Sequence, residues 1–137
     1  MEIMAVMAVI SLLIAISVPV YSQMAPTIKL NSVTRAITSD LRYAQQLAVT
    51  QQINHAVFFD LVNNSYFIIN LESQAQIKTV EIENGVSIQN ISDLTDNQAI
   101  FGATGAVVEA GQITLLNQKN DSAIIELKPS GYVQIKR

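Results

Sequence analysis

The sequence begins with a long uncharged apolar stretch, which limits the folds open to this chain more than any other feature. No charged residue lies between Glu2 and Lys29. A bilayer core is crossed by about 20 apolar residues, each adding a rise of roughly 1.5 Å to a helix. The hundred or so residues that follow have the composition of a water-soluble domain. We therefore expect an apolar stem, lying in a membrane or in the helical core of an assembly, that carries a globular head.

A cleavable signal peptide is the alternative interpretation of this stretch. Signal peptides start with basic residues and end at a small-x-small cleavage site. Here the only early charge is the acid Glu2, and no clean cleavage site follows the apolar run. We therefore favour a segment that is retained.

Composition excludes several classes of function. The net charge is −3, which is too small for strong electrostatic steering and disfavours nucleic acid binding by a general basic face. The chain has no cysteine, so disulfides, thiolate metal sites and cysteine nucleophiles are all excluded.

The apolar pattern changes after Pro26 from all sides of a helix to one side. Apolar residues then recur in steps of three and four, while Thr34, Arg35, Thr38 and Arg42 fall on the other faces. The apolar series is Leu30, Val33, Ile37, Leu41, Ala44 and Ala48. We predict one long helix that ends near residue 51, with residues 1–24 as its transmembrane or assembly half and residues 25–52 as its amphipathic half. Pro19 removes a backbone donor, and a kink or local melting is expected there, with a second such point at Pro26.

Residues 53–137 show the two-residue period of strands and are predicted to form a globular antiparallel β head. Residues 55–60 and 65–70 flank Asn63-Asn64 and give the strongest hairpin signal. A second hairpin is predicted from residues 76–83 and 86–89 around Asn84-Gly85. Further strands are expected at 99–101, 106–108, 112–116, 122–128 and 132–136. The predicted fold class is α+β, with a long helix packed on about seven short strands in meander-like order.

No catalytic or cofactor signature is present. The chain has no nucleophile elbow, P-loop or dinucleotide fingerprint, so we expect no enzyme activity and no cofactor. His55 stands alone at a helix-to-strand junction, and we expect no metal or catalytic role for it. Asp93, Asp96 and Glu109 lie in irregular segments whose oxygens could suit calcium, but no EF-hand spacing is present. We interpret them as solvated loop carboxylates and expect no metal site.

Nearly the whole chain resembles the type IV pilin-like proteins. In that family a processed chain starts with a Phe-Thr-Leu-x-Glu pattern, followed by an apolar run that ends in a helix-kinking proline. Here Glu2 and Pro19 stand seventeen positions apart, as that pattern requires. Residues 39–50, 56–60 and 63–66, with the closing segment 124–135, resemble the GspH/FimT branch of minor pilins. The stem carries the more specific part of the resemblance.

The resemblance implies that Glu2 and Pro19 serve assembly. A carboxylate at the end of a membrane helix is costly to bury alone. In the family, the glutamate pairs with the N-terminal ammonium of a neighbouring subunit, which offsets this cost and sets the register between subunits. The alternative is that Glu2 is solvated at the membrane surface or favours a helix N-terminus electrostatically.

The family's leader peptide and first processed residues have no counterpart before Met1. We therefore expect the natural chain to start upstream, and an in-frame cleavage junction in the preceding coding sequence would confirm this.

The basic residues Lys128, Lys136 and Arg137 cluster near the C-terminal end of the sequence. Some relatives in the FimT group bind DNA through a basic motif that follows a glycine. Here Gly131 is followed only by the late Lys136-Arg137 pair, and three cations give weak, salt-sensitive binding at best. We regard these residues as weak candidates for DNA or surface contact and favour a solvated strand end.

The resemblance predicts a structural subunit, a minor pilin or pseudopilin of a type IV pilus or type II secretion pseudopilus. It would be held in a bacterial inner membrane with its head outside the cytoplasm, and then assembled into a helical fibre. Its implied partners are other pilin or pseudopilin subunits through the N-terminal helix, the inner membrane and the prepilin peptidase. The alternative is a bitopic, membrane-anchored β domain that binds a ligand without polymerising.

Overall fold

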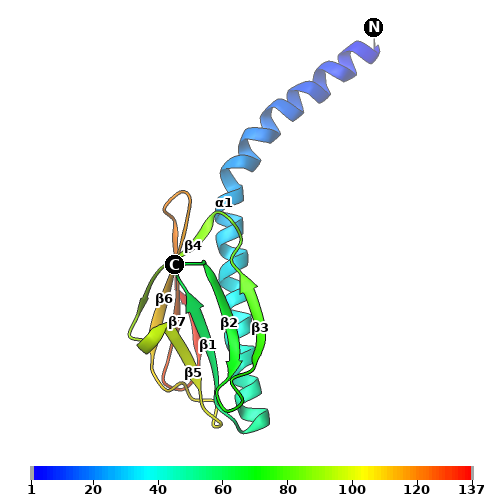
Figure 1. Ribbon diagram of the computed structural model, residues 1–137. Coiled ribbons are helices and arrows are strands. Elements are labelled where there is room, and N and C mark those ends of the chain that lie inside the picture. The colour runs from blue at the N-terminus through cyan, green and yellow to red at the C-terminus, as the bar shows by residue number, and fades with distance from the viewer. Residues whose placement is uncertain (1, 137) are drawn as a thin grey trace.

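A single long helix leads into the head, as predicted. The structure, a computed structural model, describes residues 2–136, and the side chains of Glu2 and of residues 16–20 lie outside the described residues. Helix α1 spans Glu2–Gln51 without interruption through positions 19 and 26. Figure 1 shows it lying along the head and then curving away from it as a free stem. The kink predicted from the side chain of Pro19 falls on a residue whose side chain is not described, but the helix does not melt at either proline.

The second half of α1 covers the head with the predicted apolar side. All six residues of the predicted series, from Leu30 to Ala48, are buried. The assignment of Thr34 and Thr38 to the other faces was wrong, because both are buried as well. Their hydroxyls donate to the carbonyl oxygens of Leu30 and Thr34, at 2.6 and 2.8 Å, so neither hydroxyl is left unsatisfied inside the core.

The head consists of two antiparallel four-stranded sheets. The first has the strand order β3-β2-β1-β5 and the second has the order β4-β6-β7-β8. The strands are β1 (His55–Asp60), β2 (Ser65–Asn70), β3 (Gln76–Glu81), β4 (Val86–Ser92), β5 (Gln98–Phe101), β6 (Gly111–Asn117), β7 (Ser122–Leu127) and β8 (Val133–Lys136). A short 3-10 turn, η1 (Thr95–Asn97), precedes β5. Helix α1 contacts strands of both sheets and closes the core between them.

The first predicted hairpin is confirmed. Strands β1 and β2 pair from His55 opposite Asn70 to Asp60 opposite Ser65. The Asp60 carboxylate accepts the backbone N–H groups of Val62 and Asn63, at 2.9 and 3.0 Å, and so fixes the connecting turn. These two bonds and one from the Asn63 amide hold the pKa of Asp60 below its ordinary value.

The second predicted hairpin was wrong. Strand β3 pairs with β2, whereas β4 pairs with β6 in the other sheet. The Asn84-Gly85 turn, with a φ of 104° at Gly85, therefore carries the chain from one sheet to the other. The two strands have different environments: β3 is mostly exposed, while Val86 and Ile88 of β4 point into the core.

The side chain of Asn64 joins the two sheets at this crossing. Its amide Nδ2 donates to the Val86 carbonyl at 2.8 Å, and its Oδ1 accepts the Ile88 N–H at 3.1 Å. The Asn64 carbonyl also accepts the N–H of Ile82 at 3.0 Å. The side chain of Asn64 thus satisfies two backbone groups of β4, as the backbone of a neighbouring strand would.

Other differences from the predicted strands are local. Residues 106–108 form only an isolated bridge, between Val107 and Phe101, instead of a strand. Strand β5 returns to the first sheet and lies beside β1, which makes the order of the eight strands more complex than a meander. A bulge between Ile68 and Ile69 interrupts the pairing of β2 with β3 at the edge of that sheet.

Most of the described side chains in the part of α1 beyond the head are apolar and exposed. Within the described residues, no stretch of helix combines the length and apolarity needed to cross a membrane.

Replacing Asn64 by Gly should lower the free energy of unfolding by about 1–2 kcal/mol, because both side-chain bonds to β4 are lost. Glycine tolerates the positive φ of 49° at this position, so the change isolates the side chain. Asn120→Gly is the matched control, because Asn120 also has a positive φ and is exposed. Urea unfolding followed by circular dichroism measures both. Equal losses in the two variants would contradict the bridging role of Asn64.

Candidate assembly interface

The stem exposes apolar side chains on all of its sides. Ile3 is 79% exposed, Leu12 is 64% exposed and Met24 is 58% exposed. Covering a side chain of this size with apolar surroundings contributes about 1.5–3 kcal/mol. The hydroxyl of Ser11 donates to the Met7 carbonyl at 2.8 Å, so this polar group is satisfied within the helix. The stem therefore has a strong physical need for an apolar partner, either lipid or other helices.

A shallow apolar recess of about 280 Å³ lies on one side of the stem, lined by Ala5, Val6, Val9 and Ile10. The spacing of these residues places them on one helix face. The small side chain of Ala5 leaves room beside its larger neighbours. A ridge of side chains from another helix could pack into such a recess.

The two assembly residues predicted from the sequence, Glu2 and Pro19, both belong to α1. Their side chains lie outside the described residues, so their predicted roles stay predictions.

Three polar contacts hold the stem where it leaves the head. The ammonium of Lys119, in the β6–β7 turn, donates to the Gln23 carbonyl, and the Thr27 hydroxyl donates to Asp121 in the same turn at 3.1 Å. Lys29 pairs with Glu83, on the turn that leads to β4, with 3.3 Å between Nζ and Oε1. Two turns from different parts of the head thus fix the helix just before its buried half begins.

The carboxylate of Asp121 is the acceptor at the centre of this junction. The Asn117 side chain donates to it at 2.9 Å, and the Thr27 hydroxyl is its second donor. These bonds lower the pKa of Asp121 below its ordinary value of 3.8.

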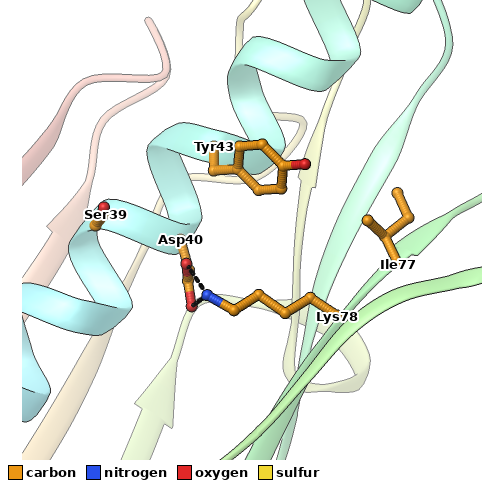
Figure 2. Close-up of a pocket in the computed structure, with 5 residues that line it drawn as sticks. All are labelled: Ser39, Asp40, Tyr43, Ile77 and Lys78. Atoms are coloured by element: carbon orange, nitrogen blue, oxygen red, sulfur yellow. Dashed lines mark hydrogen bonds and ion pairs between the residues drawn. The ribbon is translucent and has the colours of Figure 1, made fainter.

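A polar cluster that the sequence analysis did not predict lies between α1 and β3 (Figure 2). Asp40 is only 7% exposed. Its carboxylate accepts the Tyr66 hydroxyl at 2.8 Å and pairs with the Lys78 ammonium at 2.6 and 2.8 Å. Burial, followed by the bond to Asp40, raises the pKa of Tyr66, so the phenol keeps its proton and remains a donor.

Asp40 and Lys78 of this cluster line an open hollow of about 420 Å³ together with Ser39, Tyr43 and Ile77. Because Tyr66 and Lys78 already satisfy Asp40, we interpret the cluster as the tie between β3 and α1. A sequence signal for it exists, since Asp40 is an acid between Ile37 and Leu41 on the buried side of the helix.

The predicted C-terminal basic cluster is not brought together in the described part of the chain. Lys128 lies at the turn before β8, with its ammonium 5.8 Å from the centre of the Tyr132 ring. Lys136 lies at the far end of β8, about 13 Å away along the strand, and pairs with Glu126 at 2.9 Å. Arg137 lies outside the described residues.

The remaining residues considered in the sequence form no common site. His55 is fully buried; its Nδ1 lies 2.9 Å from the Ile53 carbonyl, and its Nε2 has no hydrogen-bond partner. Both carboxylate oxygens of Glu109 accept hydrogen bonds from Thr95. Within the described residues, no three His, Cys, Asp or Glu side chains are grouped closely enough to hold a metal ion.

The comparisons with known proteins find similarity in three-dimensional structure and not in sequence. No protein-family model matches the chain, and no curated protein sequence matches it. The crystal structure of the type IV minor pilin FimU from Pseudomonas aeruginosa matches with a TM-score of 0.66 and 15% identity, over 81% of this chain and 90% of that chain. The minor pseudopilin EpsH of the type 2 secretion system of Vibrio cholerae matches with a TM-score of 0.65 and 8% identity, over 79% of this chain and 96% of that chain.

The chain has a pilin-like fold. The likeness to a minor pilin and to a minor pseudopilin confirms the resemblance predicted from the sequence at the level of the fold.

Replacing Lys78 by Met should destabilise the protein by about 1–2 kcal/mol, because Asp40 would lose its cation at a nearly buried position. The loss is limited because the Lys78 side chain is 44% exposed, and water can reach the pair. Lys128→Met, at an exposed lysine without an ion pair among the described residues, is the control. Chemical denaturation at pH 7 measures both variants, and equal stability of the two would refute the role of the cluster as a tie.

The junction should weaken in acid. Because the folded-state pKa of Asp121 is depressed, its contribution is present above the ordinary value of 3.8 and is lost as the pH falls through the lower folded value. The difference in melting temperature between the wild type and Asp121→Asn should therefore be clear at about pH 7 and become smaller as the pH falls below 3.8. Glu72→Gln, at an exposed loop position, should leave the melting temperature unchanged over the same range. A difference that persists undiminished at the lower pH values would contradict this account.

Proposed function

We propose that the protein is a structural, non-enzymatic subunit of a fibre, namely a minor pilin or pseudopilin of a type IV pilus or a type II secretion pseudopilus. The observation that carries the proposal is the apolar stem, which projects from a head with a pilin-like fold and exposes its side chains. An isolated head would gain nothing from such a stem. A subunit that moves from a membrane into a fibre needs an apolar stem in the lipid and again among the neighbouring helices.

The stem would act twice in this proposal. Before assembly it would hold the chain in the bacterial inner membrane, with the head outside the cytoplasm. After assembly it would pack with the stems of other subunits, and the apolar recess at Ala5, Val6, Val9 and Ile10 suits a helix ridge. Processing by a prepilin peptidase belongs to the same proposal. The contacts at Gln23, Thr27 and Lys29 support a fixed direction for the stem where it leaves the head.

Glu2 is the residue to which we assign the register between subunits. A carboxylate enclosed among apolar stems requires a cation, and the N-terminal ammonium of a neighbour would supply it. A neutral amide of the same shape would not attract that ammonium.

The change Glu2→Gln should therefore reduce the amount of this subunit in purified fibres to background, while its amount in the membrane fraction stays normal. Sheared fibres and membranes from cells expressing each variant are compared by immunoblotting. Glu72→Gln, on the β2–β3 turn, is the control and should be incorporated like the wild type. Normal incorporation of the Glu2→Gln chain would refute the assembly role of this residue.

The same experiment separates the alternative function. A bitopic β domain that binds a ligand without polymerising would be absent from fibres in its wild-type form as well. Contact with nucleic acid at Lys128 and Lys136 is a separate and weaker proposal. A gel shift at low salt that depends on Lys136 would support it.

A further inference from the structure

The outer face of the first sheet carries large apolar side chains. Val57, Phe59 and Tyr66 of this sheet are buried in the core, so the residues that alternate with them along the strands point outward. Four outward apolar residues of β1, β2 and β5 are partly exposed, and Val108, in the segment after β5, is 62% exposed. We refer to the following five residues as the outer patch: Phe58, Phe67, Ile69, Ile100 and Val108. A solvated sheet face is polar as a rule, and an exposed apolar patch marks a site of interaction.

The register of the strands makes the outer patch continuous. Phe58 lies opposite Phe67, and their ring centres are 4.8 Å apart. One row further along the strands, Ala56 lies opposite Ile69 on one side and opposite Ile100 on the other. Ala56 is fully buried although it lies on the outer face, because its larger neighbours surround it. Three adjacent strands therefore present one apolar surface.

A recess of about 140 Å³ lies at the β5 end of the outer patch, lined by Thr95, Gln98, Ile100, Val108 and Glu109. The Val108 N–H donates to the Ile100 carbonyl at 2.8 Å, which holds the segment after β5 against the edge of the sheet. The carboxylate of Glu109 accepts the N–H and the hydroxyl of Thr95 at 2.7 and 3.0 Å. The recess thus combines two apolar walls with a carboxylate that is fixed in place, and it suits a single side chain of a partner.

The charges around the outer patch are negative. Among the residues of the four strands of this sheet, all of which the structure describes, Lys78 is the only lysine or arginine, and its ammonium is turned inward to the helix. Glu81 and Asp60 lie on either side of Ser65, in the row next to the two phenylalanines. Glu109 lies at the recess. The outer face of the second sheet differs, because it carries both signs of charge in one ion pair.

This charge pattern distinguishes between the possible occupants of the outer patch. An anionic lipid surface would be repelled by the carboxylates around the patch. A second copy that docked through the same patch would place Glu81 and Glu109 close to carboxylates of like charge. A protein surface with an apolar centre and a basic rim fits in both respects, because interface cores are apolar and complementary charges give specificity.

We propose that the outer patch docks a different protein chain, whose contact surface presents an apolar side chain flanked by lysine or arginine. The apolar side chain of the partner fills the recess beside Ile100 and Val108, and its cations face Glu109 and Glu81. This inference rests on the proposed function and names the kind of partner that the head takes. A minor subunit is present in few copies, so its neighbours in a fibre are different chains.

Photocross-linking in cells that assemble fibres tests the contact. Thr79, which is exposed and lies opposite Phe67, is replaced in the full-length chain by the photoreactive residue p-benzoylphenylalanine. After irradiation, mass spectrometry identifies the segment joined to position 79. We expect a segment of a different protein in which an apolar residue is flanked by lysine or arginine. An adduct with a second copy, with lipid or with a segment that lacks basic residues would overturn the proposal, and so would the absence of an adduct.

The same photoreactive residue at Ser87 is the control for position, because Ser87 is exposed on β4 in the other sheet. It should not capture the segment that is joined to position 79. Capture of that segment equally well from position 87 would overturn the assignment of the contact to the outer patch.

A pair of valine variants tests the apolar part of the contact. Val108→Ser in the chain with the photoreactive residue at position 79 should lower the yield of the adduct roughly fivefold, because the recess loses an apolar wall. Val62→Ser is the matched control, since Val62 is 92% exposed but lies on the β1–β2 turn outside the patch, and it should leave the yield unchanged. Equal yields from the two variants would overturn the role of the recess.

A charge series tests the polar part of the contact. Glu81→Lys should lower the yield of the same adduct roughly fivefold, as expected for the loss of exposed charge pairs and the gain of repulsion, and Glu81→Gln should give an intermediate yield. Asn90→Lys adds a positive charge at an exposed position of β4 and should leave the yield unchanged. Equal amounts of all variants in the membrane fraction check that the chains are stable. A yield that does not depend on the charge at position 81 would overturn the basic character of the partner.

Failure of this contact can be told apart from failure of the proposed function. Normal incorporation of the chain into fibres, without an adduct at position 79, would overturn the docking proposal and leave the fibre subunit standing. Absence of the wild-type chain from fibres would instead remove the proposed function on which this inference rests.

Discussion

The burial of one side of α1 against two sheets is the constraint on which the rest of this structure depends. Neither four-stranded sheet is closed, and each presents an apolar face that requires a cover. Leu30, Ile37 and Leu41 supply part of that cover along a single helix, which contacts strands of both sheets. Because the same helix continues beyond the head, the packing that stabilises the head also fixes the origin of the stem.

Polar side chains then determine how the pieces are joined. Asn64 links the two sheets, and the ion pair of Asp40 with Lys78 links β3 to the helix. At the base of the stem, the carboxylate of Asp121 accepts a hydrogen bond from the Thr27 hydroxyl. These polar contacts bury little surface. Each of them fixes the relative position of two elements, which apolar packing alone does not determine. Apolar contacts are non-directional, whereas a hydrogen bond defines both a partner and an angle.

The features that could be predicted from the sequence are those with a local period. The buried series from Leu30 to Ala48 and the hairpin of β1 and β2 could both be predicted, because helix and strand periodicities are visible in short segments of sequence. The pairing of β4 with β6 could not be predicted, because the Asn84-Gly85 turn is equally compatible with a hairpin and with a crossing between sheets. The partners of Asp40 are 26 and 38 residues away in sequence, at distances for which no local pattern exists.

The tie between Lys78 and Asp40 has a further consequence for how strand β3 meets other chains. Strand β3 is a free sheet edge, and such edges can recruit strands from other chains and start aggregation. Here the edge carries a charged lysine held across the hollow toward the helix, and the bulge at Ile68 and Ile69 disrupts its regular pairing. Both features make the edge a poor template for an added strand. The head is therefore protected at this edge against the addition of a strand from another chain.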